Sequence, residues 1–162
     1  MKKLTTIILF IMIAGYSSFG QSPLSKGKIQ FNLGAGISGW GFPLYAGMDY
    51  GIHEDITIGV EGTFRTYSYH LYSHTITGIT VNGNYHFSKI LDIPEKFDFY
   101  AGINLGYFYW MSPADYTGTG SRPGIGTQVG GRYFLNKKLG LNLEFGGGNA
   151  LSGGKFGITY IF

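Results

Sequence analysis

The sequence contains 162 residues, of which 28 are glycine, 13 are tyrosine and 13 are phenylalanine, while only 13% are charged. The aromatic content excludes glycine-rich disorder, since disordered chains are poor in aromatic side chains, and the absence of cysteine excludes both a lipid-anchored lipoprotein and a disulfide scaffold. The formal net charge of +3 comes without a basic stripe, so no nucleic-acid partner is expected.

The N-terminus has the pattern of an export signal. Two lysines precede an apolar run over 4–14, and Ser18 and Gly20 supply the small residues of a cleavage site. The run is shorter than the roughly 20 residues that a membrane-spanning helix needs. We therefore predict a cleaved secretory signal peptide over 1–20 and one mature domain over 21–162.

Eight later segments alternate apolar residues with small or polar ones, which is the period of a β-strand with two different faces. Their lengths suit tilted strands, which need about 9 to 11 residues to cross the hydrocarbon layer. The sequence therefore predicts an all-β fold, an eight-stranded antiparallel up-and-down transmembrane β-barrel. The segments are 28–38, 42–52, 56–67, 75–87, 97–110, 124–135, 139–148 and 155–162.

The connections between these segments alternate in length, and this predicts the orientation of the barrel. Residues 53–55 and 136–138 form tight turns, whereas 67–74 and 111–122 are longer loops rich in Tyr, Ser, Gly and Asp. Outer-membrane barrels have short periplasmic turns and long outer loops. Residues 88–96 are longer than a usual periplasmic turn, and Pro94 indicates a loop there.

The predicted outward positions include no charged residue and no histidine. Aliphatic residues occupy the middle of the strands and aromatic residues occupy the ends, which is typical of a lipid-facing surface with two interfacial girdles. A soluble lipocalin-type barrel would place its apolar side chains inside instead. The predicted periplasmic girdle comprises Tyr50, Tyr85, Phe87, Phe97, Phe99, Tyr133, Tyr160 and Phe162, and the outer girdle comprises Phe42, Phe64, Tyr107 and Tyr109.

The opposite face carries charged residues that are predicted to point into the lumen. We expect Arg132 to pair with Glu144 across the sixth hairpin and with Asp49 or Glu61 across the lumen, and we expect Asp98 to lie farther away. An eight-stranded barrel encloses little more than its own side chains, so the network is expected to fill the lumen. The alternative is a gate whose ion pairs exchange to open a narrow channel. The predicted polar network comprises Asp49, Glu61, Arg65, Arg132, Glu144 and Lys155.

The chain ends in an alternating run in which Gly157, Tyr160 and Phe162 resemble the C-terminal signal read by the bacterial barrel-assembly machinery. With the export signal, the girdles and the charged interior, the chain resembles the small outer-membrane barrels of the OmpA and OmpX type. It also resembles the outer-membrane β-barrel domain family of Bacteroidota. The resemblance implies a protein of the bacterial cell outer membrane with roles in membrane integrity, adhesion or, rarely, lipid chemistry.

The outer loops supply the candidate contacts of this protein. The favoured hypothesis is a monomeric, non-enzymatic scaffold whose loops meet lipopolysaccharide or another surface ligand, since exposed aromatic residues and Arg suit recognition. The alternative is a lipid A deacylase or acyltransferase in which the second outer loop supplies Ser and His. That loop has no nucleophile motif and no acid, so no catalytic residue, metal site or cofactor is predicted. The candidate contacts are Tyr69, His70, Tyr72, His74, Trp110, Tyr116 and Arg122.

Overall fold

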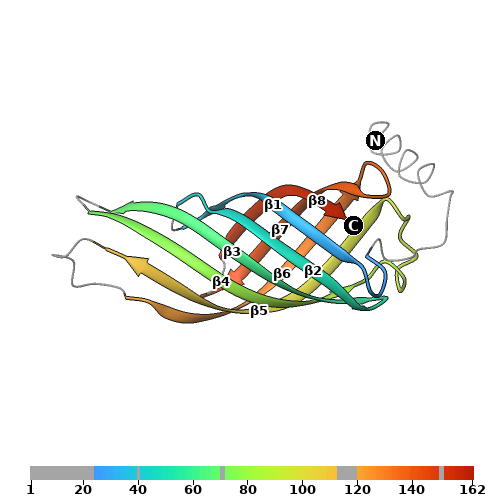
Figure 1. Cartoon of the computed structure of the whole chain (residues 1–162), viewed down its shortest axis with the longest axis horizontal. Helices are drawn as coiled ribbons and strands as arrows, with labels where there is room; N and C mark the ends of the chain where they lie inside the picture. Colours follow the sequence, from blue (N-terminus) through green and yellow to red (C-terminus); the bar gives the residue numbers. More distant parts are fainter. Residues whose placement is uncertain (1–23, 40, 70–71, 113–119, 150–151) are drawn as a thin grey trace, which may run out of the picture.

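The computed structural model describes residues 24–39, 41–69, 72–112, 120–149 and 152–162, and these form a closed barrel of eight antiparallel strands. Each strand pairs with its neighbour in the sequence, and the last strand pairs with the first (Figure 1). The predicted fold class is therefore confirmed, while the predicted signal peptide lies outside the described residues. The strands are β1 (Ile29–Ser38), β2 (Leu44–His53), β3 (Ile56–Tyr69), β4 (Tyr72–His86), β5 (Phe97–Met111), β6 (Arg122–Phe134), β7 (Leu139–Gly148) and β8 (Gly153–Ile161).

Closure of the barrel depends on the pairing of β1 with β8. Phe31 lies opposite Tyr160 in this antiparallel pair. Beyond the last ladder pair, the backbone N–H of Phe162 donates to the carbonyl oxygen of Ile29 at 3.0 Å. Because the sheet closes on itself, the ladder leaves no unpaired edge within the membrane-spanning part, and a hydrocarbon environment requires this of any β structure.

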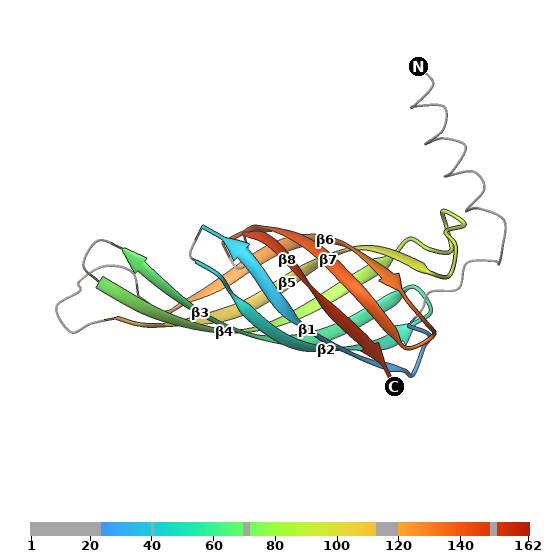
Figure 2. The same ribbon diagram turned by 90° about the horizontal axis from the view of Figure 1, so that it is seen from above.

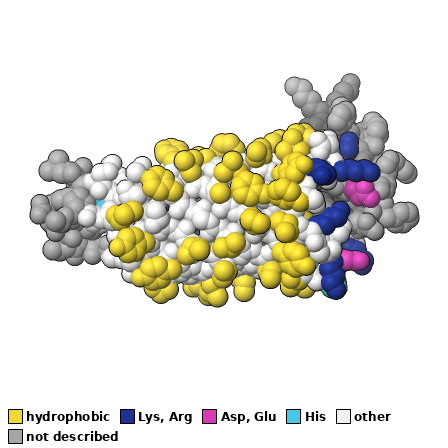
Figure 3. Space-filling view, viewed as in Figure 1, with side chains coloured by type: hydrophobic (Ala, Val, Ile, Leu, Met, Phe, Trp, Pro, Cys, Tyr) yellow, Lys and Arg dark blue, Asp and Glu magenta, His cyan; other side chains and the backbone are white. Residues whose placement is uncertain are grey.

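The outer surface of the strands is apolar. Aliphatic side chains such as Ile79, Ile103 and Ile125 are more than half exposed. Figure 3 shows hydrophobic side chains over the middle of the barrel and charged side chains gathered at one end, where the short turns lie. Lys89 and Glu54 form an ion pair of 3.1 Å between two connections at this end. The surface therefore has the outward distribution that the sequence pattern predicts.

Aromatic residues at the turn end contact one another in small groups. The Phe97 ring stacks on Phe99 with centroids 6.3 Å apart and lies 5.1 Å from the ring of Tyr133. Tyr160 and Phe162 meet edge to face at 5.2 Å. Such rings have an apolar body and a polar or polarisable edge, which suits the boundary between hydrocarbon and headgroups.

The four central strands are longer than the sequence predicts. Pairing of β3 with β4 continues through Arg65 opposite Ile76 to Tyr69 opposite Tyr72. The prediction of a loop over 67–74 is therefore wrong for most of that range. Its tyrosines and serines are typical of a loop, yet Tyr also favours a pleated strand. Figures 1 and 2 show that β3 to β6 extend well beyond β1, β2, β7 and β8 at the outer end.

No helix among the described residues is long and apolar enough to cross a membrane.

Candidate functional site

The lumen brings together the six charged residues that the sequence places there. Each of them is at most 8% exposed. They come from β2, β3, β6, β7 and β8, and every one occupies an inward position of the strand alternation. Five of the six form two ion-pair clusters, one around Arg132 and one around Lys155, while Arg65 lies apart from both.

The Arg132 cluster joins four strands. The guanidinium donates through Nη1 to Asp98 Oδ2 at 2.9 Å and through Nη2 to Asp49 Oδ2 at 3.0 Å. Its carbon lies 4.2 Å from the centre of the Tyr100 ring. With the side-chain oxygen of Gln30 turned toward the guanidinium, that oxygen accepts from Nε and Nη2 at 3.1 Å. Arg132 therefore has a partner on every edge of its fork.

Asp98 extends this cluster to a buried histidine. Its second oxygen, Oδ1, lies 2.8 Å from Nδ1 of His86, which is fully buried. The other ring nitrogen of His86 lies 3.0 Å from the hydroxyl oxygen of Thr57. Asp98 is thus held by Arg132 and His86, which offsets the high cost of burying its carboxylate.

The Lys155 cluster joins β3, β7 and β8. Nζ of Lys155 is 2.8 Å from both carboxylate oxygens of Glu61 and 2.8 Å from Oε1 of Glu144. The hydroxyl of Tyr100 donates to Oε2 of Glu144 at 2.8 Å. Because Tyr100 also lies beneath Arg132, its side chain links the two clusters.

The structure corrects the predicted partner of Arg132. The strand register places Asn142 opposite Arg132, and Glu144 opposite Gly130 on β6 and Lys155 on β8. Glu144 therefore pairs with Lys155 and not with Arg132. Asp98, which was expected to be distant, is the direct partner of Arg132. Its sequence position between two outward aromatic residues was the signal that it points inward.

The lumen between the two clusters is nearly filled. The space bounded by side chains of both clusters amounts to about 10 Å³, which is room for about one water-sized group. A Cβ atom on Gly130 would overlap the Tyr100 ring, so this glycine is needed where the tyrosine crosses the lumen. Within the described residues, no group of three His, Asp or Glu side chains is arranged to hold a metal ion.

Above these clusters, an apolar layer closes the outer mouth. Ile76 and Phe108 are almost fully buried, and Tyr67 and Trp110 pack against them. The ring of His74 lies 6.4 Å from that of Tyr67. All of these side chains come from the extended parts of β3, β4 and β5, so the same extension that lengthens the sheet also caps the lumen.

The candidate contact residues of the outer loops have different environments in the structure. His74 points into the mouth, is 1% exposed, and lies 2.9 Å through Nδ1 from the hydroxyl oxygen of Ser112. Tyr69 and Tyr72 are backbone partners at the end of the β3–β4 hairpin. Arg122 begins β6 opposite Phe108 and is partly buried. His70 and Tyr116 lie outside the described residues.

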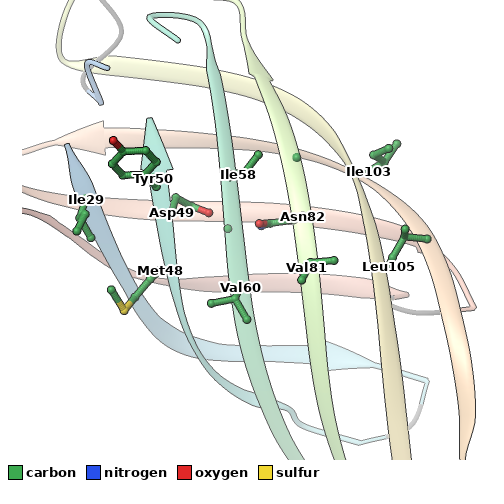
Figure 4. A pocket seen from close by; sticks show the side chains of 12 residues that line it. Ile29, Met48, Asp49, Tyr50, Ile58, Val60, Val81, Asn82, Ile103 and Leu105 are labelled. Carbon is green, nitrogen blue, oxygen red and sulfur yellow. The ribbon is translucent and has the colours of Figure 1, made fainter. Parts of the chain in front are cut away.

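A shallow recess of about 670 Å³ marks the lipid-facing wall between β1 and β5. Gly83 lies in this wall, and a Cβ atom there would meet nothing within 4 Å. On the inner side, Asp49 and Asn82 point toward one another across β3 (Figure 4), where Gly59 leaves room for both. The outward lining is aliphatic apart from one tyrosine. It comprises Ile29, Met48, Tyr50, Ile58, Val60, Val81, Ile103 and Leu105.

The three residues of the C-terminal run have different surroundings. Gly157 lies opposite Gly34 at the β1–β8 seam, and a Cβ atom on it would collide with the β1 backbone and with the Tyr45 hydroxyl. Tyr160 is partly covered by its neighbours, whereas Phe162 is 68% exposed. Gly157 is thus required by packing, whereas most of the Phe162 side chain is exposed and its contacts are the Tyr160 ring and the backbone hydrogen bond to Ile29.

A closed barrel with an apolar belt outside and paired charges inside has the architecture of a transmembrane β-barrel. Among solved structures, the chain resembles the N-terminal barrel domain of Pseudomonas aeruginosa OprF, with 12% identity, a TM-score of 0.60, and coverage of 85% of this chain and 98% of that one. It also resembles the outer membrane protein OprG from the same organism, with 10% identity, a TM-score of 0.61, and coverage of 87% and 99%.

Ail of Yersinia pestis, solved with the heparin analogue sucrose octasulfate, matches with 10% identity, a TM-score of 0.52, and coverage of 83% of this chain and 97% of that one. At such identities the likeness establishes the fold alone. No protein-family model matches the sequence, and no curated protein does either. The expected membership of the Bacteroidota barrel family therefore has no support from these comparisons.

Proposed function

We propose that this chain is an integral outer-membrane protein in which a sealed barrel carries a projecting β-sheet as a binding surface. The observation that carries the proposal is the distribution of charge. The charged groups that face the lumen are buried, and all of them except Arg65 form ion pairs, while the exposed side chains of the outer face are apolar. Water favours the reverse arrangement, so the molecule is suited to lipid.

The projecting parts of β3 to β6 are the proposed contact surface. Their inward side chains cap the lumen, so the outward face and the hairpin end remain for a ligand. This face is polar at Ser68 and Ser73, which are exposed, and aromatic at Tyr109. We propose lipopolysaccharide or another surface ligand as the partner, and the complex of Ail with a heparin analogue is a precedent for ligand binding in this fold.

The biogenesis that goes with this proposal has two parts. Residues 1–20 would direct export, and the run ending at Phe162 would be read by the barrel-assembly machinery. The polar network that fills the lumen would then act as a structural core and not as a pore. We expect a monomer, because the barrel has no unpaired strand edge in its membrane-spanning part through which copies could join.

Single-cysteine labelling tests the topology, since the natural chain contains no cysteine. Ser73→Cys places a thiol on the projecting hairpin, and Lys137→Cys places one at the opposite end, where both native residues are exposed. A membrane-impermeant maleimide should label the first variant in intact cells and the second only after the outer membrane is opened. Labelling of Lys137→Cys in intact cells, with Ser73→Cys protected, would invert the proposed orientation.

Binding is tested by immobilising the barrel in nanodiscs and measuring association with purified lipopolysaccharide. Shortening the hairpin by removing residues 67–74 should strongly weaken binding while the barrel remains folded. A matched control is Lys138→Gln at the turn end, which should bind as the natural protein does. Equal binding by the shortened chain would reject the hairpin as the contact surface.

The lipid A-modifying alternative has less support from the geometry. His74 is buried and faces inward, whereas Ser73 is on the outward face, so adjacent Ser and His side chains point to opposite sides of the sheet. The hydroxyl that His74 does approach belongs to Ser112. A comparison of lipid A from cells with and without the gene tests this alternative. An altered acyl pattern that is lost in His74→Ala would favour it.

A further inference from the structure

Arg65 differs from the other two buried cations of the lumen. It is 2% exposed, yet only Nη1 of its guanidinium has a hydrogen-bond partner among the described residues, the hydroxyl of Ser38 at 3.2 Å. Nε and Nη2 are buried without a partner. Arg132 and Lys155, in contrast, each contact two carboxylates. Leaving charged donors unpaired and buried is costly, so the free edge of Arg65 needs a physical reason.

The two unpaired nitrogens belong to one side of the guanidinium. Nε–H and one Nη2–H point in parallel along the same edge, which is the geometry that matches two oxygens of a carboxylate or phosphoryl group. Phe108 lies 6.0 Å from the guanidinium carbon and restricts the side chain from another direction. The Ser38 contact further fixes the orientation of the group. Arg65 is thus held by its neighbours and presents a preformed donor pair.

A cavity lies beside this residue at the outer mouth. It is formed where the short strands β1, β7 and β8 end, and it includes Ser38, Pro43, Arg65 and Lys155 in its lining. Its interior has room for about one water-sized group, about 10 Å³, within a wider space of about 260 Å³ that includes open solvent. The small residues Gly146, Gly153 and Gly154 border the same cavity. Because Nε and Nη2 have almost no accessible surface, a ligand oxygen reaches them only with a small shift of the cavity lining, which includes these three glycines.

We propose that this cavity is a binding site for a single oxyanion group, phosphoryl or carboxylate, held by the Nε and Nη2 edge of Arg65. One oxygen enters the cavity and accepts from both Nε–H and Nη2–H, and the rest of the group lies at the mouth of the cavity. The site is on the side of the barrel where the strands are short, so it does not depend on the projecting hairpin or on the binding surface proposed above. Two sources supply the same chemistry, free phosphate outside the cell and the phosphate groups of lipopolysaccharide.

Nuclear magnetic resonance of the arginine side chains tests the proposal directly. The chain has arginine only at positions 65, 122 and 132, so the full-length protein in detergent gives three Nε–H signals. Sodium phosphate, titrated against a constant background of sodium chloride, should shift one signal saturably. Arg65→Lys keeps the charge but loses the fork, and should weaken phosphate binding about tenfold or more by calorimetry. Lys138→Gln, at the opposite end, should bind phosphate normally.

The source is distinguished by repeating the titration with lipopolysaccharide and with the same lipid after phosphatase treatment. A shift on adding free phosphate supports the site with free phosphate as a ligand. A shift that occurs with lipopolysaccharide but not with the phosphatase-treated lipid supports the site with the lipid phosphate as the ligand. No shift with either, or an equal shift with added chloride, overturns it and leaves a cavity that holds only water. If Arg65→Lys does not fold, the Arg122→Lys variant identifies the signal of Arg122. The titration of the natural protein then tests the site, because every edge of the Arg132 guanidinium is already paired and only the Arg65 signal is expected to shift.

Discussion

Arg132 on β6 and Asp98 on β5 are directly opposite each other in the strand register and are joined by a hydrogen bond of 2.9 Å inside the barrel, toward its turn end. Both side chains are nearly or fully buried. The carboxylate also contacts His86, and the guanidinium also contacts Asp49. The pair is therefore the centre of a network that spans the lumen from one wall to the other.

Removing the positive member of this pair should strongly destabilise the barrel. Arg132→Met leaves Asp98 and Asp49 as buried carboxylates without their cation, which costs about 3 to 5 kcal/mol. In a double-mutant cycle, Arg132→Met with Asp98→Asn should show a coupling of about 0.5 to 3 kcal/mol. Unfolding by urea from lipid vesicles measures these free energies. As a control, Arg132→Met with Arg65→Met shares no direct partner and should be additive within about 0.5 kcal/mol.

The lumen should not conduct ions. The charged clusters leave space for about one water-sized group between them, so the natural protein in planar bilayers should give no discrete current steps. The double variant Lys155→Met with Glu144→Gln should also remain closed, because Tyr100 and the Arg132 cluster still fill the middle. Steps that become more frequent when the Lys155 pair is broken would instead identify a gate.

The outer cap should contribute its own share of stability. Phe108→Ala removes a buried ring that packs on Ile76, and such truncations cost about 3 to 5 kcal/mol because they leave a cavity. Tyr107→Ala, one residue away on the outward face, creates no cavity inside the protein and should cost less. Comparing the two variants by urea unfolding measures the difference. Equal losses would show that the aromatic layer is not packed as described.

The closed ladder should make the folded protein resistant to detergent. Every strand is paired on both sides, so the barrel should stay folded in SDS at room temperature and migrate differently on a gel only after boiling. The same gel checks whether each variant above has folded. Identical migration of membrane-extracted protein before and after heating would contradict a closed barrel.

The C-terminal residue should matter more for assembly than for stability. Phe162 is 68% exposed, so a chain ending at Ile161 should refold in detergent with nearly unchanged stability. In cells the same truncation should reduce the amount of protein in the outer membrane, because the terminal aromatic residue is the proposed assembly signal. Unreduced insertion would remove this role from Phe162. A large loss in both experiments would point to a structural role instead.

The number of strands, their alternation and the antiparallel order could all be predicted from the sequence, because a two-faced strand must repeat its pattern every second residue. The extent of the β3–β4 hairpin could not. Tyrosine, serine and threonine are common in surface loops and in strands alike, and what decides here is the packing of inward side chains such as Ile76 against Phe108 in the mouth. This packing involves side chains from three strands, so the length of the hairpin cannot be predicted from its own residues.

In the lumen, too, the sequence predicts which residues point inward but not which of them contact each other. Inward position follows from the alternation, so the buried charges themselves could be named. Their partners depend on register, and register depends on turn geometry that composition does not specify. A displacement of two residues separates the expected partner Glu144 from Asn142, which faces Arg132. The sequence places Asp98 far from Arg132 for the same reason. The unpaired edge of the Arg65 guanidinium depends on contacts between several strands, so the sequence does not predict it.

The hydrogen bond from the last residue, Phe162, to Ile29 at the start of β1 has a consequence for how the chain is made. Of the eight strands, β1 is synthesised first and pairs with β8, which is synthesised last, so the sheet cannot close before β8 has been made. Contacts between chain ends are slow to form because a long loop must close first. Until then, β1 carries an unpaired edge that is prone to aggregation. A chain with this topology therefore has to be kept unfolded until all eight strands are available for pairing.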